Sequence, residues 1–472
     1  MFEVNNKKNV YWLALLCFAI TLILIVLSQG TYDPGDGVQH YLIAKYAWQH
    51  PLLLLDHWGK PIYTLLCMPF AQFGFLGSNI YNLICNTATA YLAYLIAQKL
   101  GFKNAWVGFI LVFFSPLFFV TSFSGLTEPT FALILTASVL QLLNRRYIMG
   151  AILISFLPFA RTEGFFILPL FAVYLISEKE WKGLFLIGFA TLIYALIGWL
   201  VLKDFFWILH QNPYKGAIDI YGKGPLMHFV AANDRLFGLP LVVLFLLGCA
   251  CLIVGRVKIN EMRKAFYLLI LGAFGVYFIM HSVFWWKGLF GSLGLHRVMA
   301  GVAPMFSLVA LVGFNYIERF LDFKKPLQKI GMFLILIAVV IYPFKQYKPP
   351  LKPDAEMQVL LNTSNWIKSN TIKTNQKVYC MYPLLSMLLN IDVFNTQKYF
   401  STCLLKYKDF SSAIMPGDLI IWDSHFGNEC DFTPEDIAKL PEVKRIAHFE
   451  QTNGSNQKFE VVVFAVLSPV RQ

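Results

Sequence analysis

Apolar runs recur from residue 11 to residue 341, each about 20 residues long and so able to cross a hydrocarbon layer as a helix. They constrain the fold more than any other feature of this chain. Of its 472 residues, 57% are hydrophobic and only 14% are charged, a balance that a water-soluble core of this size does not require. The sequence therefore predicts an α-helical polytopic membrane protein.

The basic residues predict how these runs are oriented. They gather in alternate short connections, at residues 7–8, 99–103, 145–146, 179–182, 256–264 and 319–329, as the positive-inside rule expects of cytoplasmic loops. The net charge of +12 thus indicates membrane topology and not nucleic acid binding. We predict about eleven spans, an inside amino terminus and an outside carboxyl terminus. The spans lie near residues 10–28, 80–98, 104–121, 128–143, 147–160, 164–177, 183–202, 238–255, 265–284, 299–318 and 328–344.

One apolar stretch, residues 61–77, threatens this count. If it were a span, the predicted orientation of every later span would be reversed and the basic clusters would lie outside. We interpret it as a re-entrant or interfacial segment.

The pattern changes after residue 345. Prolines and lysines in residues 342–353 predict a linker, residues 354–370 have helical periodicity, and residues 378–381, 418–422 and 459–467 are short β-type runs. We predict a transmembrane domain over residues 1–345 and a small extracytoplasmic soluble α/β domain over residues 346–472. Its three cysteines, Cys380, Cys403 and Cys430, allow one disulfide with one thiol left over.

Three predicted outer loops, residues 29–79, 203–237 and 281–297, are where function is expected on a rigid helical scaffold. The first contains Asp33, Asp36 and His40, followed by an amphipathic stretch at residues 42–49. Glycines on both sides of Asp36 allow a tight turn that leaves its carboxylate open to a substrate. The alternative is that Asp33 and Asp36 only cap the following helix.

Further polar motifs stand at predicted outer helix ends. Thr127 can cap a span, with Glu128 in its first turn. Arg161 can pair with Glu163 or anchor a phosphate oxygen.

The third outer loop and several single residues leave two interpretations open. Lys287, His296 and Arg297 suit either lipid headgroups or the phosphate of an anionic lipid. Lone histidines, at positions 57, 210, 228 and 281, lack metal-ligand spacing, so a structural role is favoured for each. In residues 421–427 a turn with a buried tryptophan is favoured over a ligand site.

The order of these motifs and their common side of the membrane resemble the GT-C superfamily of membrane glycosyltransferases. That superfamily includes the protein O-mannosyltransferases and the aminoarabinose transferases of bacterial lipid A. The resemblance covers residues 11–341 and is carried by the acidic first loop, the amphipathic stretch behind it, and the motifs at residues 127–129 and 161–164.

The resemblance implies a role for each candidate residue. Asp36 would be the catalytic base, and the donor phosphate would be bound by Arg161, His296, Arg297 and Lys287. The supporting residues would be Asp33, His40, Glu128 and Glu163. Many relatives carry a second acidic residue directly after the aspartate, whereas this chain has Gly37.

The expected function is transfer of a sugar from a polyprenyl-phosphate donor to a glycan, lipid or protein acceptor on the extracytoplasmic face of a bacterial inner membrane. An outer-face enzyme cannot use cytoplasmic nucleotide sugars, and the sequence has neither an Asp-x-Asp metal clamp nor a glycine-rich phosphate loop. No metal ligand is predicted, although a divalent cation stays open.

The alternative functions are a transporter or flippase of a lipid-linked glycan, and a non-catalytic scaffold. We find no charged residue near the middle of any predicted span, where coupling residues would be expected in a transporter.

Overall fold

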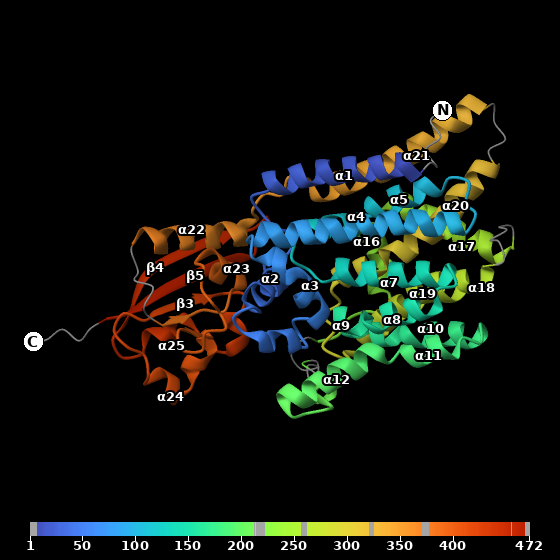
Figure 1. The fold of residues 1–472 in the computed structure, drawn as a ribbon. Helices are drawn as coiled ribbons and strands as arrows, with labels where there is room; N and C mark the ends of the chain where they lie inside the picture. Colours follow the sequence, from blue (N-terminus) through green and yellow to red (C-terminus); the bar gives the residue numbers. More distant parts are fainter. Residues whose placement is uncertain are drawn as a thin grey trace, which may run out of the picture.

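The computed structural model describes residues 7–211, 213, 222–255, 262–320, 325–370, 377–454 and 456–467. Parts of the basic connections predicted at residues 256–264 and 319–329 lie outside these residues. Figure 1 shows a helical bundle with the strands gathered at one end of it, next to α2 and α3.

The bundle contains both long and short helices. In chain order they are α1 (Lys7–Leu27), α2 (Asp36–Tyr46), η1 (Pro51–Leu55), α3 (Pro61–Ala71), α4 (Phe75–Lys99), α5 (Ala105–Phe113), α6 (Pro116–Val120), η2 (Thr121–Phe123), α7 (Glu128–Leu143), α8 (Tyr147–Ser155), α9 (Leu157–Ala160), η3 (Thr162–Phe166), α10 (Leu168–Ser177), α11 (Trp181–Leu186), α12 (Phe189–Leu202), α13 (Trp207–His210), α15 (His228–Ala231), α16 (Asn233–Phe237), α17 (Leu239–Ile253), α18 (Arg263–Ala265), the π-helix η4 (Phe266–Gly272), α19 (Ala273–Lys287), η5 (His296–Val302), α20 (Ala303–Phe320) and α21 (Lys325–Tyr347).

Every apolar stretch that the sequence predicts as a span lies in one helix or in consecutive helices. Among the described residues, six helical segments have the length and composition to cross a membrane: Lys7–Leu27, Phe75–Lys99, Trp181–Leu202, Arg263–Lys287, His296–Glu318 and Lys329–Tyr347. A pair bent by 61°, Ala105–Phe113 with Pro116–Phe123, would make a seventh. The chain is therefore mostly helical with six or seven apolar spans.

Four further predicted spans are shorter apolar helices: Glu128–Leu143, Tyr147–Ala160, Thr162–Ser177 and Leu239–Ile253. The doubtful stretch after residue 60 is shorter still, an 11-residue helix with Pro69 inside it. A helix of that length rises about 17 Å, well short of a hydrocarbon layer. The total of eleven spans and their orientation stay predictions.

The first loop differs from expectation in one element. The stretch predicted to be amphipathic at the lipid surface belongs largely to α2, which is buried on nearly every side, including Leu42, Ile43 and Ala44. It is covered because residues near the carboxyl terminus lie against it: Lys45 Nζ donates to Asn390 Oδ1 at 2.8 Å, and His50 Nε2 lies 2.9 Å from Asp392 Oδ2. The surface that we predicted to face lipid therefore contacts residues of the carboxyl-terminal region instead.

The carboxyl-terminal region contains a mixed five-stranded sheet with the order β2-β1-β3-β5-β4. Strand β1 pairs in parallel with β2 and β3, and β5 pairs antiparallel with β3 and β4. The elements are α22 (Ala355–Ser369), β1 (Val378–Tyr379), α23 (Pro383–Leu388), β2 (Tyr399–Phe400), η6 (Thr402–Lys406), α24 (Lys408–Ser411), β3 (Leu419–Asp423), η7 (Gly427–Cys430), α25 (Pro434–Ala438), β4 (Val443–Thr452) and β5 (Lys458–Val466).

Three predicted β-type runs coincide with β1, β3 and β5, but β2 and β4 were not predicted. Strand β2 has two residues, and β4 is mostly exposed and rich in charged side chains, so neither forms an apolar run. The predicted linker is wrong in its first half, because α21 continues to Tyr347 with Pro343 inside it. Cys403 and Cys430 form a disulfide and Cys380 is a buried free thiol, as the cysteine count allowed.

Candidate functional site

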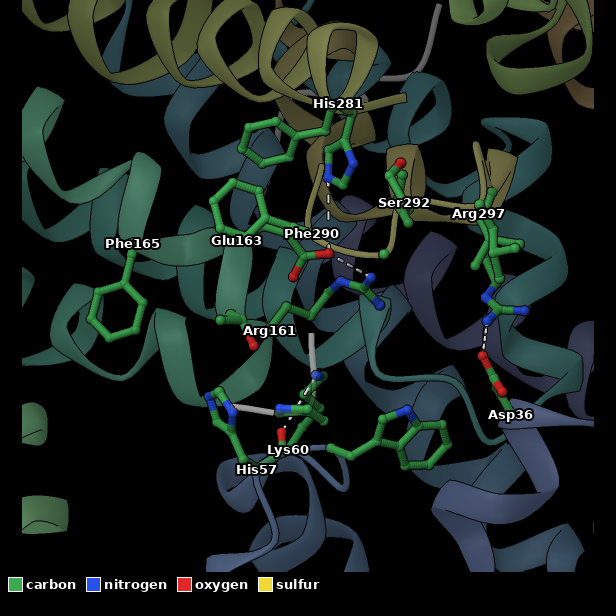
Figure 2. A pocket seen from close by; sticks show the side chains of 18 of the residues that line it. Asp36, His57, Lys60, Arg161, Glu163, Phe165, His281, Phe290, Ser292 and Arg297 are labelled. Carbon is green, nitrogen blue, oxygen red and sulfur yellow. Dashed lines mark hydrogen bonds and ion pairs between the residues drawn. The ribbon is translucent and has the colours of Figure 1, made fainter. Parts of the chain in front are cut away.

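Side chains from all three predicted outer loops line one cavity of about 530 Å³. Figure 2 shows Asp36, His57 and Lys60 from the first loop opposite His281, Phe290 and Arg297 from the third. Its apolar lining consists of Phe165, Phe166, Leu209, Phe284, Phe290 and Leu293. The cavity therefore offers both charged groups and hydrocarbon-like surface to a ligand.

Arg297 connects the first and third loops. Its Nη1 donates to Asp33 and its Nη2 to Asp36, while the side chain itself is 16% exposed. Asp33 also accepts a hydrogen bond from the backbone N–H of Gly37 at 2.8 Å, so it does secure the start of α2. Asp36 is the first residue of α2 and not its cap, and its side chain is 42% exposed at the cavity. Of the two predicted caps, only Asp33 behaves as one.

Arg161 lies deeper and is shared by two carboxylates. Its Nη1 donates to Glu128 Oε1 at 2.6 Å and its Nη2 to Glu163 Oε1 at 2.9 Å. The predicted pairing with Glu163 is present, and Glu128 adds to it. Thr127 occupies the N-cap position of α7 as predicted, but its side chain makes no capping hydrogen bond, and its hydroxyl accepts one from Arg161 at 3.2 Å.

Glu128 links the two arginines into one network. Its side chain is fully buried, and its Oε1 lies 3.9 Å from Arg297 Nε as well as 2.6 Å from Arg161. Within the described part of the chain, Glu128 Oε2 and Arg161 Nε have no hydrogen-bond partner. Buried polar atoms in proteins are nearly always hydrogen-bonded, so these two atoms indicate a place for water or a ligand.

Lys60 was not singled out by the sequence, although it lines the cavity. It is 4% exposed, has a left-handed backbone with φ of 62°, and directly precedes Pro61 at the start of α3. Its Nζ donates to the His57 carbonyl at 3.4 Å. A non-glycine residue in this conformation is uncommon, and such conformations cluster at functional sites.

Three histidines also line the cavity: His40, His57 and His281. His40 stacks on Trp58 with ring centroids 4.6 Å apart, and burial lowers its pKa well below the ordinary value. Burial and the nearby charge of Lys60 lower the pKa of His57 to about 4. Both imidazoles are therefore neutral near pH 7. A structural role was favoured for His57 and His281 because no spacing in the sequence connects them.

Two of the predicted phosphate ligands do not line the cavity. Lys287 is exposed and its Nζ lies 3.7 Å from the centroid of the Trp286 ring. The ring of His296 lies 4.8 Å from that of His228. The remaining predicted residues, Asp33, Asp36, His40, Glu128, Arg161, Glu163 and Arg297, all line the cavity or belong to its ion network.

The segment at residues 421–427 contributes more than a turn. Trp422 is buried and its Nε1 donates to the Phe432 carbonyl at 2.9 Å, as the structural interpretation predicted. Phe426, however, reaches the cavity from the end of the same segment. This contact depends on how the carboxyl-terminal region packs against the first loop, which no local pattern encodes.

Gly37, where many relatives of the predicted superfamily have a second acid, lies against the segment before α7. A Cβ added at Gly37 would lie 3.3 Å from Asp33 Cβ and 3.4 Å from the backbone nitrogen of Gly125. A larger side chain after Asp36 would crowd both contacts. The departure from the pattern thus has a steric reason.

A group of potential metal ligands lies away from the cavity, on β4 and β5. His448, Glu450 and Glu460 form the one such group among the described residues. Lys458 Nζ already lies 2.7 Å from Glu450 and 3.3 Å from Glu460. Lys458 therefore already supplies these carboxylates with a positive charge, and no metal ion is needed for it.

No protein-family model and no curated protein match this chain. Solved structures do. ArnT from Cupriavidus metallidurans bound to undecaprenyl phosphate is 9% identical with a TM-score of 0.63, over 99% of this chain and 100% of that one. The arabinofuranosyltransferase AftD from Mycobacteria is 10% identical with a TM-score of 0.54, over 97% of this chain and 40% of that one. The Archaeoglobus fulgidus oligosaccharyltransferase is 11% identical with a TM-score of 0.51, over 96% and 74%. The chain therefore shares the overall fold of these three structures.

Proposed function

We propose that this protein is a membrane glycosyltransferase that moves a sugar from a polyprenyl-phosphate donor to an acceptor on the extracytoplasmic face. The observation that carries the proposal is that carboxylates, several cations and apolar side chains line one and the same cavity. A lipid-linked sugar has the matching parts: a hydrocarbon chain, a phosphate and a reactive sugar carbon. One of the structures with the same fold, that of ArnT, holds undecaprenyl phosphate.

The donor phosphate is placed among Lys60, Arg161 and Arg297, which line the same cavity. Charge-assisted hydrogen bonds from such groups are the usual means of holding phosphate. Lys60 is the one to test first, because its replacement leaves the ion pairs of both arginines in place. The apolar wall around Phe165 and Phe290 accepts the first part of the polyprenyl chain. A phosphate role for His296 and Lys287 stays a prediction.

Asp36 serves as the base. The acceptor oxygen attacks the anomeric carbon of the donor sugar, and its proton passes to the Asp36 carboxylate. The bond between that carbon and the phosphate oxygen breaks, and the electron pair leaves with polyprenyl phosphate. Fixed cations stabilise the charge that develops on this leaving group. Attack from the face opposite the phosphate inverts the anomeric centre.

The ion network positions the reacting groups. Arg297 holds the Asp36 carboxylate at the cavity edge, and Glu128 anchors Arg297 to Arg161. Asp33 pairs with Arg297, Glu163 pairs with Arg161, and His40 lines the cavity beside them. Groups fixed in this way need no reorganisation when the reaction occurs.

The proposed orientation has the amino terminus in the cytoplasm, about eleven spans, and the cavity and carboxyl-terminal region outside, in the inner membrane of a bacterium. Reporter fusions at Gly35 and after Tyr347 should be extracytoplasmic, and a fusion after Lys99 should be cytoplasmic. A cytoplasmic reporter at Gly35 would contradict the proposed side of catalysis.

Donor binding is tested on the full-length protein in lipid nanodiscs with undecaprenyl phosphate as the probe. Lys60→Gln should weaken binding about tenfold to a hundredfold, because a hydrogen bond to a charged group contributes about 1.5–3 kcal/mol. Lys182→Gln, an exposed lysine outside the cavity, is the matched control and should bind as the wild type does. Unchanged binding by Lys60→Gln would remove Lys60 from the donor site, and no binding by the wild type would contradict the donor class.

A further inference from the structure

A second cavity, of about 320 Å³, shares Asp36, Trp58 and Phe426 with the first. Its other walls come from the start of α2 and from the carboxyl-terminal region, including Phe394 and Tyr399. Among the described residues, Asp36 is the one carboxylate that lines both cavities. A base at this position can reach a ligand in either of them.

The two cavities differ in charge. The first has Lys60, Arg161 and Arg297 in its lining. The second, over the described residues, has no lysine, arginine or histidine in its lining, and Asp36 is its one charged group. Its remaining polar side chains include the neutral amide of Gln39.

The neutral lining of the second cavity is aromatic and hydroxyl-bearing. Trp58, Phe394, Tyr399 and Phe426 supply rings, and Ser401 supplies a hydroxyl. Aromatic faces with a few placed polar groups bind ligands that have both apolar and hydrogen-bonding surfaces. A pyranose or furanose ring is such a ligand, since its C–H face can lie on a ring while its hydroxyls bind amides and hydroxyls.

We infer that the second cavity binds the acceptor, and that the acceptor is a neutral sugar residue of a glycan that offers a free hydroxyl. This inference rests on the proposed glycosyl transfer. A phosphorylated acceptor would carry a charge of about −1.5 to −2 at pH 7, and the cation that pairs with Asp36, Arg297, lines the first cavity and not the second. The volume lies at the lower end of the range for small-ligand pockets, about 300–1,000 Å³, which suits one or a few sugar units.

The reaction then runs across Asp36. The sugar hydroxyl in the second cavity gives its proton to the Asp36 carboxylate as its oxygen bonds to the anomeric carbon of the donor in the first cavity. The leaving phosphate keeps the electron pair of the broken bond and stays on the cationic side. No oxidant, reductant or further reactant is needed.

The carboxyl-terminal region is therefore part of the acceptor site. Phe426 is fixed by its backbone N–H, which donates to Asp423 Oδ1 at 2.8 Å, and Asp423 is 2% exposed. The contacts of Lys45 with Asn390 and of His50 with Asp392 hold the same region against α2. If these contacts opened, the second cavity would lose one of its two sides.

The experiment measures binding of two probe sets to the full-length protein in nanodiscs by saturation-transfer NMR: neutral methyl glycosides, and the corresponding sugar phosphates. Val393→Trp fills the second cavity, and Gln397→Trp, an exposed residue of the same loop outside the lining, is the control. Neutral glycosides should bind the wild type and the control, and about tenfold more weakly to Val393→Trp. Undecaprenyl phosphate binding should stay equal in all three, which also shows that the variants are folded.

A second variant reverses the charge argument. Gln39→Lys places a cation in the second cavity and should raise the affinity for sugar phosphates about fivefold or more. Stronger wild-type binding of sugar phosphates than of neutral glycosides would overturn the inference. So would unchanged glycoside binding by Val393→Trp, or displacement of the glycosides by a serine-containing peptide. Failure of the wild type to bind undecaprenyl phosphate would instead overturn the proposed donor. The acceptor inference would still be tested, because glycoside binding is measured without the donor.

Discussion

Two walls of the cavities meet at Asp36, and they consist of different kinds of side chain. The wall from the helical bundle consists of buried ion pairs in which Glu128 joins Arg161 and Arg297. The wall from the carboxyl-terminal region consists of ring contacts around Phe426, which lies 4.4 Å from the His425 ring and 5.2 Å from the Tyr382 ring. The first wall places fixed charges in the cavities, whereas the second lines them with uncharged side chains.

The difference indicates a division of labour within the proposed reaction. Buried charges are costly unless they are paired, so a network of this kind is expected where a charged ligand has to be held. Aromatic contacts impose shape without charge and suit a neutral ligand. The predictions below alter one wall, the other wall, or the junction between them.

The largest effect is expected at the junction. Asp36→Asn keeps the size of the side chain but removes the proton acceptor, and general-base catalysis typically contributes about 10² to 10⁴ in rate. Turnover should fall by that factor while undecaprenyl phosphate binding is kept. Asp409→Asn, an exposed aspartate outside both cavities, is the control. An Asp36→Asn variant as active as the wild type would show that another group accepts the proton.

Shortening a side chain should reduce the stability of the protein more in the charged wall than at an exposed ion pair. Glu128→Ala removes a fully buried carboxylate that lies 2.6 Å from Arg161 and 3.9 Å from Arg297, and loss of one member of a buried pair costs about 3–5 kcal/mol. Glu178→Ala removes a more exposed pair with Lys264, for which about 0–1 kcal/mol is expected. Thermal unfolding of both variants in nanodiscs compares the two losses. Equal losses would mean that the buried network is not what stabilises this wall.

The backbone beside the junction is tightly packed. Gly125→Ala places a methyl group 2.2 Å from the Gly37 carbonyl oxygen, so the start of α2 has to move. Overpacking of this kind costs about 1–3 kcal/mol. Gly275→Ala, where a Cβ meets nothing within 4 Å, should leave the unfolding temperature unchanged or raise it slightly. A Gly125→Ala protein as stable and active as the wild type would contradict this contact.

The stability of the aromatic wall should depend on pH. Burial raises the pKa of Asp423 from 3.8 to about 6, so its stabilising contribution is complete below pH 3.8 and is lost as the pH rises through 6. The hydrogen bond with Glu356 raises the pKa of His425 above 6.5, so that contribution is also lost as the pH rises through the raised value. Both shifts make this wall less stable at pH 8 than at pH 5.

Hydrogen exchange of residues 419–431 measures this effect, which is on the order of 1–2 kcal/mol for Asp423. Asp423→Asn keeps an oxygen that can accept the backbone bonds of His425 and Phe426 while it removes the titration. Exchange in this variant should vary less between pH 5 and pH 8 than in the wild type. An unchanged pH dependence would rule out Asp423 as its source.

Much of the helical architecture could be predicted because apolar runs and basic loops are local signals. The same holds for Asp36, Arg161 and Glu163, which stand out as charges at the ends of apolar helices. Lys60 carries no such signal: its place in the cavity depends on a left-handed backbone before Pro61. Whether a lysine next to a proline adopts that conformation is decided by tertiary contacts.

The sequence pointed to the acceptor side only through the ligand site at residues 421–427, which was the less favoured of two interpretations. Phe426 lies about 390 residues from Asp36 in the chain, and its role depends on two regions folding against each other. Strand β4 was missed because its exposed, charged pattern is that of a sheet edge and not of a core. The arginines posed a different problem, since the sequence shows their charge but not that Glu128 and Asp33 share it.

The central claim is tested most directly by following a synthetic undecaprenyl-phosphate-linked sugar in proteoliposomes that contain the full-length protein. The account predicts release of undecaprenyl phosphate, with the sugar transferred to a glycan supplied on the side of the membrane that the carboxyl terminus faces. Asp36→Asn should slow the release by about 10² to 10⁴. Movement of the intact lipid-linked sugar across the bilayer without release of undecaprenyl phosphate would contradict the account and identify a flippase.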